Sequence, residues 1–66
     1  MMASKVRFAE VRKTLEQAGY TLVRISGSHH IFAKAGESLL SIPVHRGKVK
    51  AFYARQIEKI IQGKDA

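Results

Sequence analysis

The sequence contains no cysteine, no tryptophan and a single proline among its 66 residues. Without cysteine, neither a disulfide framework nor a thiolate zinc site can hold the fold together, so the apolar core has to do so alone. The longest uninterrupted apolar run is only a few residues, and the N-terminus has no signal-peptide pattern. We therefore expect a cytoplasmic protein that has no membrane partner.

Acidic residues are also scarce, because five Asp and Glu stand against twelve Lys and Arg, and the formal net charge is +7. A chain this short buries only about 60 % of the surface that its unfolded form exposes, which excludes a two-domain enzyme with a deep cleft. We expect one domain over residues 1–66. Such a charge is typical of a protein with an anionic partner, although the same charges also serve plain solubility.

Two segments have the apolar spacing of amphipathic helices. The first helix is predicted over about residues 5–18, with Ser4 as its N-cap and Gly19 as its left-handed terminal residue. The second follows a loop over residues 44–48 and is predicted to stop at Gly63. The apolar stripes consist of Phe8, Val11, Leu15 and Ala18 in the first helix and of Val49, Phe52, Tyr53, Ile57, Ile60 and Ile61 in the second.

The residues between these helices favour three strands. Residues 20–26 and 29–34 are rich in aromatic and β-branched residues and are separated by a Gly-Ser break. A turn over residues 35–37 leads to a third strand over residues 38–42, which Pro43 ends or confines to a sheet edge. We predict an α+β fold of order α-β-β-β-α, with a three-stranded antiparallel sheet and both helices on one face.

Positive charge concentrates on the predicted sheet and on the loop that follows it, since no acidic residue lies between Glu37 and Glu58. Lysine and arginine side chains on such a surface release counterions from a nucleic acid backbone. Tyr20 and Tyr53 are the aromatic residues expected to be free for a base, because Phe8 and Phe52 belong to the apolar stripes. The expected RNA-binding residues are Arg24, Ser28, Lys34, His45, Arg46, Lys48 and Lys50.

Three histidines border this basic segment: the doublet His29 and His30, and His45 after the third strand. Neighbours on a strand point to opposite faces, so an ordinary doublet would have one exposed and one packed imidazole. Histidine, with an ordinary pKa of about 6.5, can also move a proton to or from an RNA ribose while nearby cations stabilise the phosphorus. Because the doublet diverges and no carboxylate is near in sequence, we expect no metal and no other cofactor.

The segment from Gly27 to Phe32, Gly-Ser-His-His-Ile-Phe, resembles the HicA family of mRNA interferase toxins, and the likeness covers nearly the whole chain. The resemblance implies a fold like the double-stranded RNA-binding domain, cleavage of mRNA or other single-stranded RNA, and neutralisation by a HicB-type antitoxin. It also implies that His29 is the catalytic histidine, with His30 as a second candidate. The other matching segments are Ala18-Gly19-Tyr20, Leu22-Val23-Arg24, Ile42-Pro43-Val44-His45 and Ile57-Glu58-Lys59-Ile60-Ile61.

These observations together predict a metal-independent endoribonuclease toxin of a type II toxin–antitoxin system. The alternative is a non-catalytic RNA-binding module with the same basic surface, which would bind RNA and tolerate the loss of His29. A third interpretation makes the sheet a docking surface for an acidic protein. It is compatible with the first, because an antitoxin that covers the histidine would inhibit by occlusion.

Overall fold

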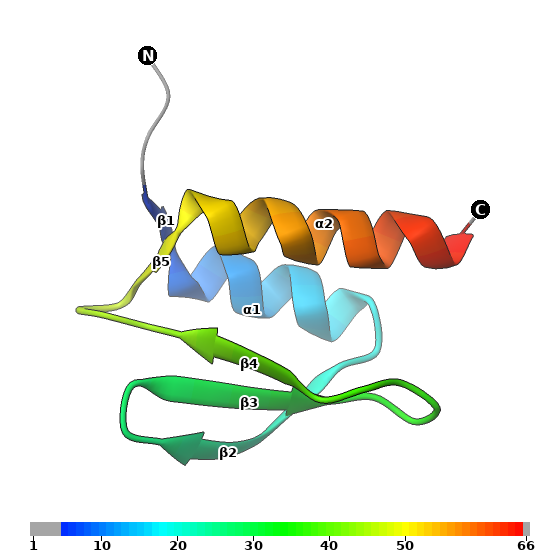
Figure 1. The fold of residues 1–66 in the computed structure, drawn as a ribbon, viewed down its shortest axis with the longest axis horizontal. Coiled ribbons are helices and arrows are strands. Elements are labelled where there is room, and N and C mark those ends of the chain that lie inside the picture. Colours follow the sequence, from blue (N-terminus) through cyan, green and yellow to red (C-terminus); the bar gives the residue numbers. More distant parts are fainter. Residues whose placement is uncertain (1–4, 66) are drawn as a thin grey trace.

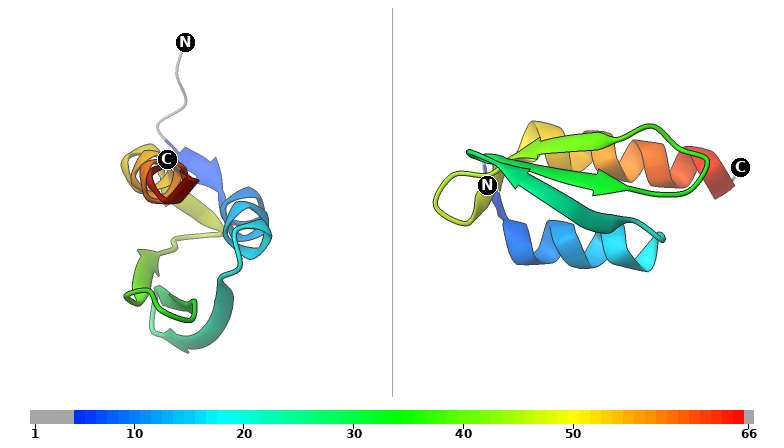
Figure 2. Two further views of the ribbon diagram at one scale, coloured as in Figure 1. Left: turned by 90° about the vertical axis from the view of Figure 1, so that its right-hand side faces the viewer. Right: turned by 90° about the horizontal axis from the view of Figure 1, so that it is seen from below.

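A computed structural model describes residues 5–65 of the chain. Strands β2, β3 and β4 form an antiparallel sheet with β3 in the centre, and β1 and β5 form a separate two-stranded antiparallel ribbon. Both helices lie on the same side of the three-stranded sheet (Figure 1 and Figure 2). The element order is β1 (Lys5–Arg7), α1 (Phe8–Gln17), β2 (Thr21–Ser26), β3 (His29–Ala33), β4 (Leu40–Pro43), β5 (Lys48–Lys50) and α2 (Ala51–Asp65).

The predicted α+β class and the antiparallel three-stranded sheet are confirmed, but the predicted order misses the ribbon. Residues 5–7 were expected inside the first helix and residue 49 inside the second, yet both segments are strands. Alternation along a strand turns the two valines of the ribbon inward and its four cations outward. Val49 is fully buried. The cross-strand pairs are Lys5 with Lys50, Val6 with Val49 and Arg7 with Lys48.

The first helix therefore begins at Phe8, three residues later than predicted. Ser4, the expected N-cap, lies outside the described residues. Arg7 occupies the N-cap position in an extended conformation and makes no side-chain capping hydrogen bond. The backbone N–H of Phe8 donates instead to the carbonyl of Gly47 at 2.8 Å, so the turn that precedes β5 supplies an acceptor at the start of the helix.

The end of α1 is where its glycine predicts it. Gly19 has a φ of 98°, the left-handed conformation that favours glycine. Its N–H donates to the carbonyl of Glu16 at 3.0 Å, and the Tyr20 N–H donates to the carbonyl of Leu15 at 2.9 Å, which is the Schellman pattern of helix termination. The chain thereby folds back so that Tyr20 and Leu15 are both buried in the core.

The core lies between the helices and the sheet and draws on nearly every element. Among the described residues its fully buried large side chains are Phe32, Leu15 and Val49. The buried side chains form one cluster, which includes residues from both helices, from the strands and Tyr20. The ribbon and the three-stranded sheet therefore share one core. The buried residues are Val11, Leu15, Tyr20, Phe32, Ile42, Val49 and Ile57.

Helix α2 differs from its prediction at both ends, since it begins at Ala51, two residues after Val49. It runs through Gly63, which was expected to stop it, to Asp65. Its inward face is formed around Ile57, and Phe52, five residues earlier, lies about 140° away from Ile57 around the helix. Phe52 is accordingly 56 % exposed, so its assignment to the core is wrong. Tyr20 is only 4 % exposed, so the expectation that it is free for a base is also wrong.

The edge strand β4 begins two residues later than predicted and ends on Pro43. A proline fits this place, because an edge strand needs no ladder hydrogen bond on its open side. No helix within residues 5–65 is long and apolar enough to cross a membrane.

Candidate functional site

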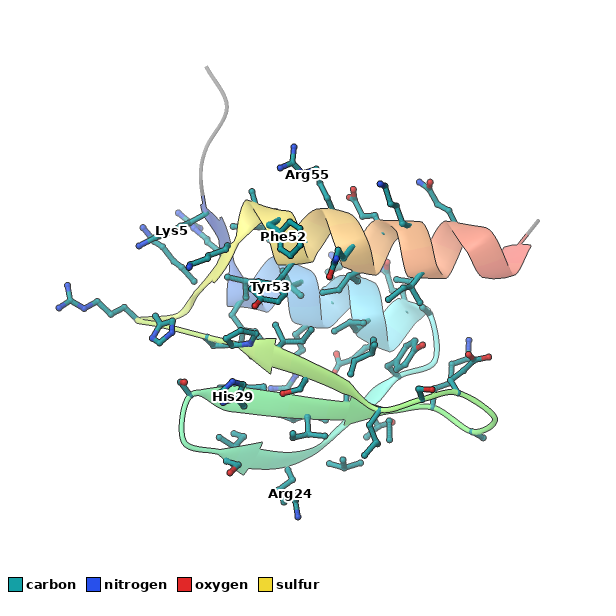
Figure 3. All side chains as sticks on the ribbon, viewed as in Figure 1. Lys5, Arg24, His29, Phe52, Tyr53 and Arg55 are labelled. Carbon is teal, nitrogen blue, oxygen red and sulfur yellow. The ribbon has the colours of Figure 1, made fainter. Side chains whose placement is uncertain are left out.

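A cavity of about 340 Å³ opens where the start of β3, the end of β4, the ribbon and the first turn of α2 meet. It contains both an exposed histidine of the doublet and the histidine that follows β4. No carboxylate is present among the described residues that line it, whereas three lysines are. The lining residues are Lys5, His29, Pro43, His45, Lys48, Lys50 and Tyr53. Figure 3 shows His29 at the start of β3 and Tyr53 between α2 and the sheet.

The sheet register explains how His29 and His45 come to line one cavity. His29 lies directly opposite Pro43 across the β3–β4 ladder. The Val44 N–H donates to the carbonyl of Ser28 at 2.7 Å, which continues the ladder past the end of β4. His45 is two residues beyond Pro43, so it lies diagonally across from His29. Diagonal neighbours of this kind have Cα atoms roughly 7 to 8 Å apart, which leaves room for a phosphate between two imidazoles.

His30 faces the other side of the sheet, as alternation along β3 predicts. Its ring packs on Phe8 with 4.6 Å between the ring centroids and an interplanar angle of 57°. Its Nδ1 atom is buried and has no hydrogen-bond partner. The imidazole that served as the second catalytic candidate therefore points into the helix layer and not into the cavity.

The ribbon supplies most of the cavity's charge in an unusual arrangement. Lys5 lies directly opposite Lys50, and Arg7 lies directly opposite Lys48, all on the outward face. Like charges in directly opposed cross-strand positions repel and destabilise the pair. An ion pair lies elsewhere, between Arg12 and Glu16 on α1, with 3.0 Å between Nε and Oε2. No carboxylate is among the described residues that line the cavity, so a bound anion would relieve this repulsion.

The first turn of α2 adds to this positive potential. It follows directly on Lys50 and contains no acidic residue. The N-terminus of a helix carries about half a positive charge. The start of α2 therefore attracts an anion to the cavity, as the lysines also do.

A tight turn between β4 and β5 positions His45 and Lys48 side by side. The His45 N–H donates to the Lys48 carbonyl and the Lys48 N–H donates to the His45 carbonyl, both at 2.9 Å. The two residues between them, Arg46 and Gly47, have φ values of 53° and 75°. Two positive φ values in a two-residue turn are typical of type I′ geometry. Arg46 is the one non-glycine residue in the described chain with a positive φ, and it stands at the tip of this turn.

Several predicted RNA-binding residues lie away from the cavity. Arg24 on β2 is paired with Ile31 on β3, and its side chain points away from the helices (Figure 3). Lys34 is half-buried, with its Nζ 5.6 Å from the centre of the Tyr20 ring, so it makes a cation–π contact. Ser28 sits in the β2–β3 turn and contributes its backbone carbonyl to the ladder. The structure thus gathers His45, Lys48 and Lys50 at the cavity, and leaves Arg46 on the adjoining turn.

Lys5 is the cavity residue that the sequence did not suggest, since residues 5–7 were assigned to a helix. A usable signal was present, because Lys-Val-Arg and Lys-Val-Lys both place a valine between two cations. Such matched alternation fits two short strands that share one buried face. No cluster of three or more metal-ligating side chains occurs within the part of the chain that is described.

Fold and cavity together define a small basic α+β protein in which two histidines and several lysines line one anion-attracting site. The sequence matches the family described as the HicA toxin of bacterial toxin–antitoxin systems over residues 8–62. The chain therefore belongs to the HicA toxin family, as its sequence resemblance implied, and is a toxin whose system includes an antitoxin. Comparison with curated proteins and with solved structures gave no match.

Proposed function

We propose that this toxin is a metal-independent endoribonuclease that cleaves mRNA or other single-stranded RNA, with His29 as its catalytic histidine. The cavity carries this proposal, because it places an exposed imidazole beside three lysines and no carboxylate among its described lining. That combination suits a phosphodiester, which needs a proton acceptor and charge stabilisation at the same place.

The RNA supplies its own nucleophile in this mechanism. His29 accepts the proton of a ribose 2′-hydroxyl, and the resulting oxygen attacks the adjacent phosphorus. The bond from phosphorus to the 5′-oxygen of the next nucleotide then breaks, and that oxygen takes up a proton. The products are a 2′,3′-cyclic phosphate and a free 5′-hydroxyl. His45, diagonal to His29, is the proposed donor of the second proton.

The lysines stabilise the charge that develops during this reaction. The pentavalent phosphorus carries one more negative charge than the ground state, and preorganised cations stabilise it most when water is partly excluded. Lys5, Lys48 and Lys50 line the cavity and have this role in the proposal. Arg46, at the tip of the adjoining turn, contacts a neighbouring phosphate.

A flexible single strand suits this shallow site better than a rigid duplex. Unstacked loops and ends can bend into the cavity and present a ribose to His29. Succession of α1, β2, β3, β4 and α2 supports a fold like the double-stranded RNA-binding domain, extended by the ribbon. Arg24 and Lys34 do not line the cavity, and in this proposal they contact other parts of the strand.

The proposed protein partner is a HicB-type antitoxin that inhibits by covering the cavity. The charge of +7 and the unpaired lysines of the ribbon favour an acidic partner surface. Such a surface would neutralise the like-charge pairs and block His29 at the same time.

The direct test is cleavage of a single-stranded RNA in the presence of EDTA, with the products identified by mass spectrometry. We expect a cyclic phosphate, no cleavage where the 2′-hydroxyl is replaced by hydrogen, and loss of cleavage in His29→Ala. Unchanged cleavage in His29→Ala would remove the central claim. Tight binding by the folded wild type without cleavage of any RNA would instead establish the non-catalytic RNA-binding module.

A further inference from the structure

Phe52 presents a large aromatic ring to solvent at the edge of the cavity. It is 56 % exposed, although phenylalanine is usually buried. Other exposed large apolar side chains lie on β2 or in the β3–β4 loop, at Val23, Ile25 and Leu39. Phe52 differs from them because it stands in the first turn of α2, next to a residue that lines the cavity.

Tyr53 connects this exposed ring to the site. The two rings meet edge to face, with 5.4 Å between their centroids and an interplanar angle of 77°. Tyr53 is itself half-buried, packs against the core and lines the cavity. Figure 3 shows Tyr53 turned from α2 toward the sheet, with Phe52 on the helix beside it. The core thus holds Tyr53 in place, and Tyr53 contacts the Phe52 ring, while much of Phe52 stays exposed.

Cations flank the open ring on both sides along the chain. Lys50 is two residues before it and lines the cavity. Arg55 is three residues after it and is also exposed; Figure 3 shows it extending above α2, away from the sheet. The nearest acidic residue along the helix is Glu58, which borders the groove between the two helices instead. An aromatic ring between two cations matches a nucleotide, which has a flat base between negatively charged phosphates.

We infer that Phe52 and Tyr53 form a nucleobase-binding subsite, in which a base of single-stranded RNA next to the cleaved bond stacks on Phe52. This inference rests on the proposed function, because it assigns a place to the strand that the cavity cleaves. The stacked base anchors the strand while Lys50 and Arg55 contact the phosphates on either side of it. Stacking is tolerant of base identity, so the subsite selects unpaired nucleotides over duplex and contributes little sequence preference.

Binding of a strand that cannot be cleaved tests this subsite independently of catalysis. The probe is a short 2′-fluoro single strand, which has no 2′-hydroxyl to act as nucleophile, and its partner is an abasic strand with the same number of phosphates. We expect the wild type to prefer the strand with bases. Phe52→Ala should weaken binding of that strand by roughly 5- to 100-fold and leave binding of the abasic strand unchanged.

Conservative variants separate stacking from plain hydrophobic contact. Phe52→Tyr keeps a ring and should retain the preference, whereas Phe52→Leu keeps apolar bulk and should lose it. Leu39→Ala removes an apolar side chain that is 64 % exposed and does not line the cavity, so it is the control variant and should change nothing. Because these side chains are exposed, their thermal unfolding midpoints should match that of the wild type.

Two results would overturn the subsite. One is an unchanged affinity of Phe52→Ala for the strand with bases, and another is a Phe52→Leu variant that binds like the wild type. In the first case, a Phe52→Ala variant that has also lost antitoxin binding would assign this face to the protein partner. Wild-type protein that binds the strand with the expected preference but never cleaves RNA would contradict the proposed function and leave the subsite intact.

Discussion

His29 and His30 are adjacent in β3, and their imidazoles lie on opposite sides of the sheet, one lining the cationic cavity and the other packed on Phe8. This relationship gives two neighbouring histidines opposite expected responses to mutation. Loss of a group that transfers a proton costs about 10²- to 10⁴-fold in rate. We expect such a loss of RNA cleavage in His29→Leu, with the free energy of unfolding nearly unchanged because His29 is exposed.

His30→Leu is the matched variant. It removes a buried ring nitrogen that has no hydrogen-bond partner and keeps an apolar contact for Phe8. Removing an unsatisfied buried polar atom is close to neutral or stabilising, so the unfolding free energy should change by less than about 1 kcal/mol. Cleavage per folded molecule should equal that of the wild type. A His30→Leu variant that folds normally and has lost cleavage would transfer the catalytic role to His30.

His45 should affect turnover more than binding. It lines the cavity diagonally across from His29, where the leaving 5′-oxygen would receive its proton. We expect His45→Ala to lower kcat about 100-fold with little change in KM, because a proton donor acts in the transition state. Lys48→Ala, beside it in the same turn, should mainly raise KM. An unchanged rate constant for single-turnover cleavage by His45→Ala would restrict His45 to positioning the turn.

The pair of Lys5 and Lys50 should trade stability against RNA binding. Lys5→Glu converts a repulsive cross-strand pair into an attractive one, so the unfolding free energy should rise by about 0.2 to 1 kcal/mol in urea denaturation at low salt. RNA affinity should fall, and the log–log salt slope should decrease by at least about 0.7, the value of one lost phosphate contact on a single strand. Lys13→Glu, which changes the net charge equally on the exposed side of α1, should leave most of the affinity. Equal effects of the two variants would show that only overall charge matters.

Replacing Arg46 should also raise stability and weaken RNA binding, here because of its backbone conformation. Its φ of 53° places a side chain in the left-handed region, at a cost of about 1 to 2 kcal/mol. Asparagine tolerates this region without adding the chain entropy that glycine brings. Arg46→Asn should therefore raise the unfolding free energy by about 1 kcal/mol and reduce RNA affinity. A loss of stability would mean that the guanidinium makes an ordering contact that outweighs the strain.

Much of the fold could be predicted because long elements carry repeated signals. The stripe of α1 repeats over Val11 and Leu15, and the strands on either side of the Gly27-Ser28 turn have strong β composition. The sequence analysis missed the ribbon because each of its strands has only three residues. Three residues are too few to distinguish the two-residue apolar period of a strand from the period of a helix. Val49 fits both patterns, and the pairing that decides between them joins residues more than forty positions apart.

The error at Phe52 follows from the same ambiguity. Counting Val49 as helical extends the apparent stripe of α2 and takes Phe52 into it, whereas the helix begins at Ala51. Only part of the candidate site could be predicted from the sequence. Alternation separates His29 from His30 in any strand, but the approach of Lys5 to His29 depends on the ribbon, which only the tertiary structure reveals.

Gly19 and Gly63 were both predicted as helix stops, and their alanine variants should shift stability in opposite directions. At Gly19 the φ of 98° is unfavourable for alanine, and an added Cβ would lie 3.2 Å from Cε of Lys34. Gly19→Ala should lower the unfolding free energy by about 1 to 2 kcal/mol, chiefly through the backbone, because the Lys34 side chain can move.

Gly63 lies inside α2 with nothing within 4 Å of an added Cβ, so Gly63→Ala should raise the unfolding free energy by up to about 0.5 to 1 kcal/mol. Urea denaturation with equal m-values would make the comparison direct. Since neither glycine lines the cavity, RNA cleavage by the folded fraction should be the same in both variants. Destabilisation by Gly63→Ala would contradict a helix that continues to Asp65.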